Sequence, residues 1–273
     1  METTPDSIHK VNVTVGADPE FFLAHKFTPI SAVGLIGGTK ASPAPLGREG
    51  FFVQEDNVAV EFNIPPAKDL NSFVESIEWS IQTIRETINK NGLSMRITAS
   101  EYFNPTELES PQARTFGCDP DYSAWTGDVN PKPQAKNDRL RTCGGHIHVG
   151  WEDVDKDHHL FRRRVAQAMD LYLGVPSIIM DVQWARRELY GKAGAMRMPP
   201  YGIEYRTLSN FWLRKTELVQ WAYAQTIRSF NYVCQTKNWK TLDSLQGDIV
   251  STINGSKYDT AKHMCKDLEL AIV

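Results

Sequence analysis

The apolar and polar residues of this chain alternate with the two-residue period of a β-strand in several separate segments. The first runs through residues 11–15 into Gly16-Ala17-Asp18-Pro19-Glu20-Phe21-Phe22-Leu23, where the aromatic residues indicate a strand facing the interior. A second strand, residues 58–64, is expected to end at Pro65-Pro66, because proline interrupts strand pairing. Further strands are expected at residues 93–99, 146–151 and 203–208.

A helical period separates some of these strands. Apolar residues from Leu70 to Ile88 form one stripe, and Asn91-Gly92 supplies a stop signal. A second helix is expected over residues 157–173, broken at Gly174-Val175-Pro176 and resuming to about Leu189.

The remaining segments are long insertions and a helical tail. Loops rich in glycine or proline are expected at residues 29–50, 104–140 and 191–202, and helix is expected from about residue 213 onward. This mixed order predicts one α+β domain. Its expected parts are a tail (residues 1–10), the main catalytic part (11–213) and a C-terminal helical extension of the same domain (214–273).

Composition narrows the classes of protein. The 273 residues are 41% hydrophobic and 23% charged, as in an ordinary globular protein, and the net charge of −3 provides no overall attraction to nucleic acid or anionic membrane. No apolar run reaches the roughly 18 residues of a membrane span, and the polar N-terminus lacks a signal-peptide core. The four cysteines have no close-paired spacing, so we expect free thiols and a cytoplasmic location.

Two acidic positions stand in apolar strands. Asp18 and Glu20 are two residues apart, so on a strand they share a face with α-carbons about 6.5 Å apart. Two such carboxylates repel each other unless a cation lies between them, which favours a divalent metal site over a solvated turn. Glu61 lies in the strand of residues 58–64, where it either finds a buried partner or faces water at a sheet edge.

Two histidines follow a glycine pair in Gly144-Gly145-His146-Ile147-His148-Val149-Gly150. His146 and His148 share one strand face, and the glycines allow close approach of another backbone or a phosphate. The pair fits core histidines, a zinc site or a contact to a Mg²⁺–nucleotide. Zinc is the least favoured of these, because only His158, His159 and His263 follow and no cysteine pair completes a ligand set.

A third acid lies among arginines near residue 200. Glu204 and Arg206 share one face of a strand, which is explained equally by a simple salt bridge or by a metal ligand beside an anion-binding arginine. The Gly-rich segment 191–202 carries Lys192 and Arg197 and is preceded by Arg186-Arg187, as expected of a loop that contacts phosphates. Hard oxygen ligands with arginines suit Mg²⁺ bridging ATP phosphates.

These motifs together resemble a known family. Residues 16–23, 144–150 and 203–206 are similar to the acidic, His-bearing and Glu-x-Arg strands of glutamine synthetase. With Asp-Asn-Val-Ala-Val-Glu-Phe-Asn-Ile-Pro-Pro and Tyr-Gly-Ile-Glu-Tyr-Arg-Thr-Leu-Ser-Asn-Phe-Trp, the chain resembles the phage-encoded carboxylate–amine ligases of type 2, compact relatives of glutamine synthetase and glutamate–cysteine ligase. The resemblance extends from about residue 13 to about residue 213.

The resemblance implies a glutamine-synthetase-like catalytic domain, a curved antiparallel sheet with helices on its convex side, whose concave face holds ATP and two or more Mg²⁺ ions, with Mn²⁺ as a substitute. It implies metal ligation by Asp18, Glu20, Glu61 and Glu204. His146 would contact the metal or the nucleotide, and His148 is a weaker candidate for the same role. Lys192 and Arg197 would contact the nucleotide. The transferred phosphoryl group would be stabilised by Arg187, Arg197 and Arg206. Asp18 stands where longer synthetases carry glutamate.

The implied reaction is amide formation through an acyl phosphate. The segment 104–140, with Asp119, Asp121 and Arg141, is expected to bind the amine or carboxylate substrate and exclude water. An amino acid, a peptide, a cell-wall fragment, a protein terminus and a modified nucleotide all stay open as substrates, as does a homo-oligomer. The alternatives are a phosphagen-type kinase on the same sheet and a non-catalytic binding protein that retains the fold.

Overall fold

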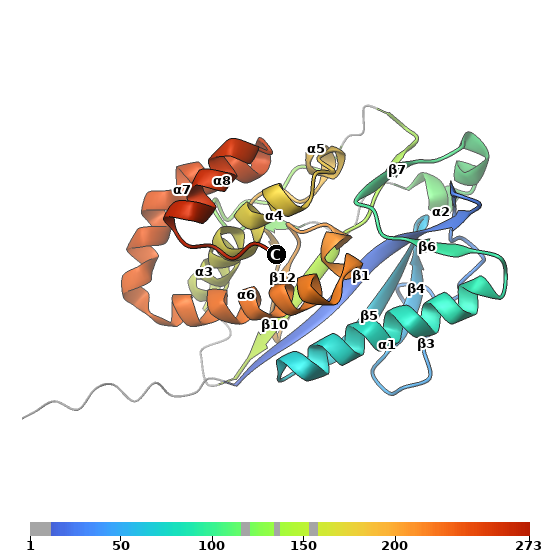
Figure 1. Cartoon of the computed structure of the whole chain (residues 1–273), viewed down its shortest axis with the longest axis horizontal. Coiled ribbons are helices and arrows are strands. Elements are labelled where there is room, and N and C mark those ends of the chain that lie inside the picture. Colours follow the sequence, from blue (N-terminus) through green and yellow to red (C-terminus); the bar gives the residue numbers. More distant parts are fainter. Residues whose placement is uncertain (1–11, 116–120, 134–136, 153–157) are drawn as a thin grey trace, which may run out of the picture.

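An antiparallel sheet with helices over one face forms the molecule (Figure 1). The computed structural model describes residues 12–115, 121–133, 137–152 and 158–273. Within them, the sheet follows the order β3-β4-β5-β1-β10-β12-β11-β8, while β2 and β6 also pair with β1. These strands are β1 (Val13–His25), β2 (Thr28–Ile30), β3 (Ala44–Pro45), β4 (Phe52–Asp56), β5 (Ala59–Ala67), β6 (Ser94–Arg96), β8 (Tyr122–Ser123), β10 (Gly145–Trp151), β11 (Ala195–Arg197) and β12 (Gly202–Tyr205). A separate pair joins β7 (Ser100–Tyr102) to β9 (Leu140–Thr142).

The α+β class expected from the sequence is confirmed. The helices are α1 (Leu70–Asn89), α2 (Pro111–Arg114), α3 (His159–Met169), α4 (Val175–Met180), α5 (Ala185–Leu189), α6 (Thr216–Cys234), α7 (Trp239–Asn254) and α8 (Tyr258–Asp267). No helix of the described residues is long and apolar enough to cross a membrane.

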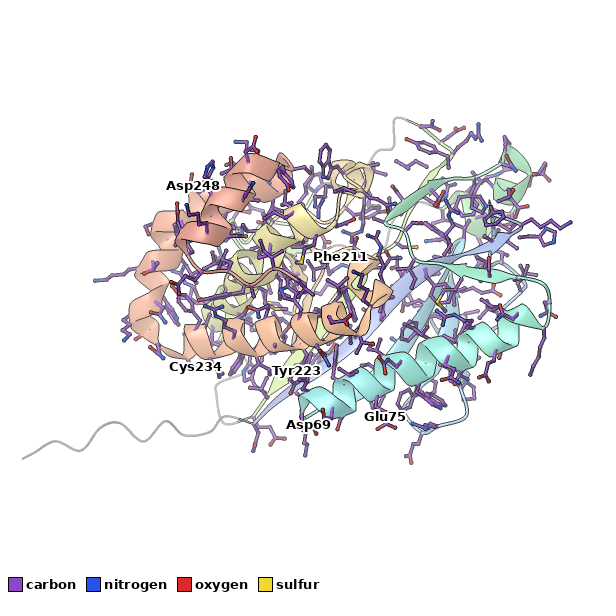
Figure 2. All side chains as sticks on the ribbon, viewed as in Figure 1. Asp69, Glu75, Phe211, Tyr223, Cys234 and Asp248 are labelled. Atoms are coloured by element: carbon purple, nitrogen blue, oxygen red, sulfur yellow. The ribbon has the colours of Figure 1, made fainter. Side chains whose placement is uncertain are left out.

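Strand alternation divides the sheet into an apolar face and a polar face. The apolar face packs against α1, whose N-cap Asp69 accepts a hydrogen bond from the Ser72 amide at 2.9 Å. The ring of Phe73 on α1 lies 5.4 Å from that of Tyr223 on α6, which joins the two helices over the sheet. Figure 2 labels Asp69 at the start of α1 and Tyr223 on α6. The buried strand residues of this core include Ala17, Phe21, Val60, Phe62, Ile147, Val149, Ile203 and Tyr205.

The residues between those core positions therefore point to the opposite face. The register of β1 sets Asp18 opposite His146 on β10 and Glu20 opposite Glu61 on β5. On the next strand, His148 lies opposite Glu204. Because cross-strand partners share a face, the sequence-distant acids and histidines form one polar surface away from the helices.

Two expected boundaries are wrong. Strand β5 continues through Pro65-Pro66 to Ala67, because its pairing with β1 changes register there and a bulge accommodates residues that cannot donate to the ladder. The helix is not broken at Gly174-Val175-Pro176. Residues Asp170–Gly174 form a π-helical turn in which the Val175 amide donates to the Asp170 carbonyl, and the break falls after Met180.

The sequence reading also omitted short strands. β4 was not expected, although it carries Gln54 and Asp56 on the polar face beside β5. β11 lies inside the Gly-rich segment, and it sets Arg197 opposite Glu204. The expected free thiols are confirmed for Cys143, Cys234 and Cys265.

Candidate active site

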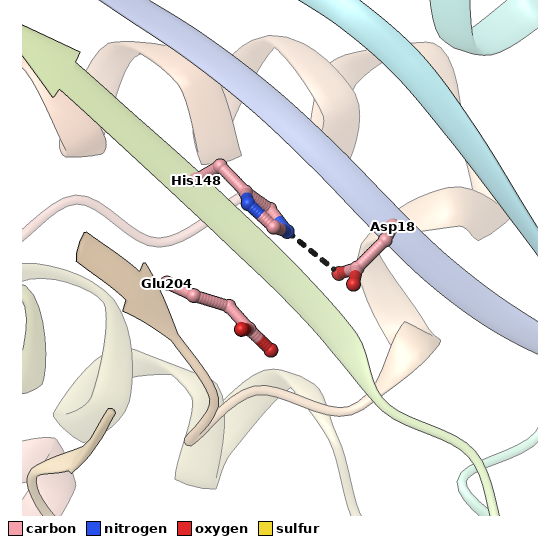
Figure 3. A group of neighbouring side chains, drawn as sticks. All are labelled: Asp18, His148 and Glu204. Atoms are coloured by element: carbon pink, nitrogen blue, oxygen red, sulfur yellow. Dashed lines mark ion pairs between the residues drawn. The ribbon is translucent and has the colours of Figure 1, made fainter. Parts of the chain in front are cut away.

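Three strands of the polar face bring together the first group of candidate metal ligands, Asp18, His148 and Glu204 (Figure 3). One donor atom from each residue lies within 4.8 Å of the other two. The closest contact is 3.0 Å between His148 Nε2 and Asp18 Oδ1. The Tyr201 hydroxyl hydrogen-bonds the other ring nitrogen of His148, which fixes the orientation of the imidazole.

A second group of candidate ligands consists of Glu20, Asp56 and Glu61, again with donor atoms within 4.8 Å of one another. The Gly144 amide donates to Glu20 Oε2 at 2.8 Å. The Gln54 side chain donates to Glu61 Oε1 at 2.8 Å. These neutral donors orient the carboxylates. Arg186 and Arg206 act on Glu20, and Lys40 acts on Asp56, but burial outweighs their attraction.

The carboxylates of the second group are buried close to one another, which disfavours their charged forms. Burial raises the pKa of Glu20 to about 7, and Asp56 adds to the effect. Burial also raises the pKa of Glu61 well above its usual value, with Asp18, Glu20 and Asp56 contributing repulsion. A divalent cation would relieve both the repulsion and the lost hydration, so this donor set fits a metal ion.

The first group has a different balance of charge. Burial opposes ionisation of Asp18, but His148 and His146 outweigh it and lower the pKa of the carboxyl group. Burial and Asp18 likewise oppose ionisation of Glu204, whose pKa is nevertheless lowered by Arg206, His146 and Arg197. Both carboxylates are therefore held in the charged form that binds a metal.

His146 contacts the first group and also lines the cavity that Glu20 and Asp56 of the second group line. Its Nδ1 is 3.3 Å from Asp18 Oδ1 and 3.7 Å from Glu204 Oε1. Burial, assisted by Arg206, lowers the pKa of His146 to about 4, so its imidazole is neutral near pH 7 and suited to ligation. Gly144 makes room for the ring, because a Cβ at that position would lie 2.3 Å from His146 Nε2.

Two of the arginines named from the sequence reach these groups. Arg206 contacts Glu204 through Nη1 and lies 3.4 Å from Asp121 Oδ2 through Nε. Arg197 Nη1 lies 3.4 Å from Glu204 Oε1. Both guanidinium groups therefore lie beside a candidate ligand of the first group.

Arg187 and Lys192 are not brought to the site. The Arg187 guanidinium donates to the Ser177 hydroxyl at 3.2 Å and lies 3.8 Å from Asp181 Oδ2. Lys192 contributes its backbone carbonyl, which accepts the Thr207 hydroxyl at 3.0 Å. Neither residue lines the cavity beside the second group.

That cavity joins the carboxylates of the second group to the segment expected to bind substrate. Asp121 and Arg141 line it, and Asp119 lies outside the described residues. The Arg141 guanidinium donates to three backbone carbonyls, those of Ala113, Asp138 and Leu140. The remaining lining residues include Glu20, Asp56, Asn57, Thr115, His146, Arg186, Tyr190, Gly191 and Arg206.

Sequence reasoning missed Asp56, Tyr201 and Arg186. Asp56 lies within the motif that carries the family resemblance, but its strand was not recognised. Arg186 adjoins Arg187, and nothing in the spacing of the two arginines distinguishes the one that faces the cavity.

Comparisons with known proteins find similarity over part of the chain. Residues 138–243, which contain β10, β11 and β12, match the family described as "Phage phiEco32-like COOH.NH2 ligase-type 2". This match confirms the resemblance drawn from the motifs and supports a carboxylate–amine ligase. The solved structures similar to this chain include one titled "Crystal structure of novel glutamine synthase homolog", with 13% identity and a TM-score of 0.40 over 94% of this chain and 66% of that chain. The search of curated proteins gives no match.

Proposed function

We propose that this protein is an ATP- and Mg²⁺-dependent carboxylate–amine ligase that forms an amide bond through an acyl phosphate. The observation that carries the proposal is the pair of ligand groups on one sheet face, the first around Asp18 and the second around Glu20, with Arg206 beside both. The family match over residues 138–243 supports the same class of reaction.

The metal ions are assigned from the donor sets. Carboxylate oxygens with one imidazole suit Mg²⁺ or Mn²⁺ bound together with phosphate oxygens. Asp18, His148 and Glu204 would hold one ion, with His146 adjacent, and Glu20, Asp56 and Glu61 would hold another. When bound, the ions would neutralise the negative charge of the ATP phosphates.

Residues of the chain bind the transferred phosphoryl group and shield the reacting groups from water. Arg206 and Arg197 donate to the anionic oxygens of the transferred phosphoryl group, for which a planar guanidinium is well shaped. In the reaction, a substrate carboxylate oxygen bonds to the γ-phosphorus as ADP leaves. An amine then attacks the acyl carbon, loses a proton and displaces phosphate. The cavity next to Glu20 holds the reacting groups and limits the access of water.

The test is a product analysis. The protein is incubated with ATP, Mg²⁺ and a pool of amino acids, short peptides and cell-wall fragments, and the products are analysed by mass spectrometry. We expect a new mass equal to two substrates less one water, with ADP and phosphate in matching amounts. A stable phosphorylated product without condensation would instead assign the protein to the kinases, and no nucleotide binding would favour a binding protein.

A further inference from the structure

A fully buried carboxyl group, that of Asp170, lies beside β12 on the helix-covered side of the sheet. It belongs to the π-helical turn between α3 and α4 and is 0% exposed. The Trp125 indole donates to its Oδ2 at 2.6 Å, and the Tyr205 hydroxyl donates to its Oδ1 at 2.7 Å. The Thr207 hydroxyl lies 3.1 Å from Oδ1. None of these four side chains lines the cavity, so the proposed reaction gives them no direct role.

Two of these partners stand directly before and after Arg206 in the chain. The Arg206 side chain itself contacts Glu204, a candidate ligand of the first group. Because Tyr205 and Thr207 are both fastened to the same carboxyl group, the backbone between them has little freedom to shift. The Thr207 hydroxyl also lies 3.0 Å from the Lys192 carbonyl oxygen, which ties the Gly-rich segment to the same cluster. The carboxyl group therefore restricts the point from which the guanidinium reaches the site.

The third partner fastens the segment that carries Asp121. Trp125 follows Asp121 by four residues, and Asp121 Oδ2 lies 3.4 Å from Arg206 Nε. Gln167, three residues before the carboxyl group and on the same helix face, donates to the Ala124 carbonyl at 2.9 Å. This helix face therefore holds both sides of the contact between the arginine and the acid.

The helix leaves room for this cluster. Gly174 lies in the same π-helical turn, and a Cβ there would lie 2.9 Å from the Tyr205 hydroxyl oxygen and 3.3 Å from Asp170 Oδ1. Any larger residue would crowd the hydrogen bond between those two groups. Such π-helical turns are rare and occur often at functional sites. An apolar residue in place of Asp170 would avoid the cost of burying a carboxyl group, so packing alone does not require it.

We infer that Asp170 is a positioning residue for phosphoryl transfer, which holds Arg206 and the Asp121 segment in the arrangement that the transferred group requires. It acts through its hydrogen-bond partners, Trp125, Tyr205 and Thr207. The inference rests on the proposed function, since it assigns a role within the same reaction. Placement matters for such an arginine, because an error of about 1 Å can lower a rate about a hundredfold.

Single substitutions separate positioning from stability. Trp125→Phe keeps an aromatic ring and removes one donor, and Asp170→Ala removes the carboxyl group that all three partners share. In ligation assays with ATP and Mg²⁺, we expect kcat per folded molecule to fall about tenfold or more in each variant. KM for ATP should change by less than about threefold, because ground-state binding does not depend on the exact placement of the guanidinium.

Trp221→Phe is the matched control. The Trp221 indole is also buried and donates to the Ala271 carbonyl at 2.9 Å, but it does not line the cavity, so its loss should leave kcat unchanged. Combined with Asp170→Ala, Trp125→Phe should add no further loss of kcat, because the indole acts through that carboxyl group. Circular dichroism checks that each variant is folded, and Trp125→Phe carries the test if the alanine variant is not.

Hydrogen exchange provides a readout that requires no turnover. The Ala124 amide donates to the Gly194 carbonyl at 2.8 Å. This amide should exchange about tenfold faster in Trp125→Phe and at the wild-type rate in Trp221→Phe, while the amides of α1 keep their rate in both.

A wild-type kcat in Trp125→Phe, or a loss of kcat that Trp221→Phe reproduces, would overturn the inference and leave Asp170 a contributor to stability alone. If the wild type forms no ligation product, the proposed function fails. Faster exchange confined to the segment around Ala124 would then leave the fastening by Asp170 standing, and an unchanged rate would remove that as well.

Discussion

Glu20 on β1 and Glu61 on β5 are directly opposite each other in the strand ladder, so two buried carboxyl groups meet across a cross-strand pair. Like charges in that arrangement destabilise a sheet. The pair belongs to the second ligand group, and it persists in a fold whose other face is packed with apolar residues. The Glu20–Glu61 pair therefore lowers the folding stability at the position where the proposed reaction needs a cation.

We therefore expect Glu61→Gln to raise the stability of the metal-free protein, by up to about 1 kcal/mol, because it removes the repulsion and keeps an acceptor for Gln54. Thermal unfolding in the presence of a chelator measures this gain. Added Mg²⁺ should stabilise the wild type more than the variant, because ligand binding to the folded state adds stability. Glu75→Gln, on the exposed face of α1, is the control and should change neither quantity. A destabilised variant that responds normally to Mg²⁺ would argue against a metal at Glu61.

Glu20→Gln and Glu204→Gln test the two ligand groups separately. Each substitution keeps the side-chain volume and removes one charged donor, so we expect an intact fold and a loss of turnover of at least about a hundredfold. Circular dichroism and steady-state ligation assays measure the two effects. Activity within a few-fold of wild type in either variant would remove that residue from the metal site.

The elements that carry the candidate site residues were predictable where the sequence pattern is long and regular. The alternation around Asp18 and Glu20, and the single apolar stripe of α1, each specify an element by several residues at once. The shared face of His146 and His148 followed directly from the strand period. These inferences needed no knowledge of the partner strands.

What could not be predicted depends on contacts distant in sequence. β4 has three polar residues among its five and is held by pairing with β3 and β5, so Asp56 was not recognised as a neighbour of Glu61. Which of Arg186 and Arg187 faces the cavity depends on the rotation of the short helix α5. Arg187 lies 3.8 Å from Asp181 and does not line the cavity. Pro176 indicated a helix break, but a π-helical turn at Asp170–Gly174 lets the helix continue through this position.

Arg206→Lys tests the role of the guanidinium in phosphoryl transfer. Lysine keeps the positive charge near Glu204 and His146 but loses the planar fork, so turnover should fall by about a hundredfold while ATP affinity changes much less. Steady-state kinetics and calorimetry with ATP measure the two effects. If ATP binds poorly and turnover is normal at saturation, Arg206 is instead a contact of the bound nucleotide.

Asp170 predicts a pH dependence of stability that is independent of the proposed metal sites. This fully buried carboxyl accepts hydrogen bonds from Trp125 Nε1 at 2.6 Å and from the Tyr205 and Thr207 hydroxyls at 2.7 and 3.1 Å. Burial nevertheless raises its pKa from 3.8 to about 7, despite these donors.

A raised pKa means that the folded protein binds this proton more tightly than the unfolded chain does. The contribution of Asp170 to the free energy of unfolding is therefore greatest below about pH 4, declines as the pH rises toward 7, and is constant above that value. Asp170→Asn removes the titration. The stability of the wild type minus that of the variant should fall between pH 5.5 and 7, by at most about 1.4 kcal/mol per pH unit. Denaturant unfolding at matched ionic strength measures the difference, and Asp248→Asn on exposed α7 serves as the surface control. A difference that is flat or that rises across this interval would mean that the three donors, and not burial, determine the charge of Asp170.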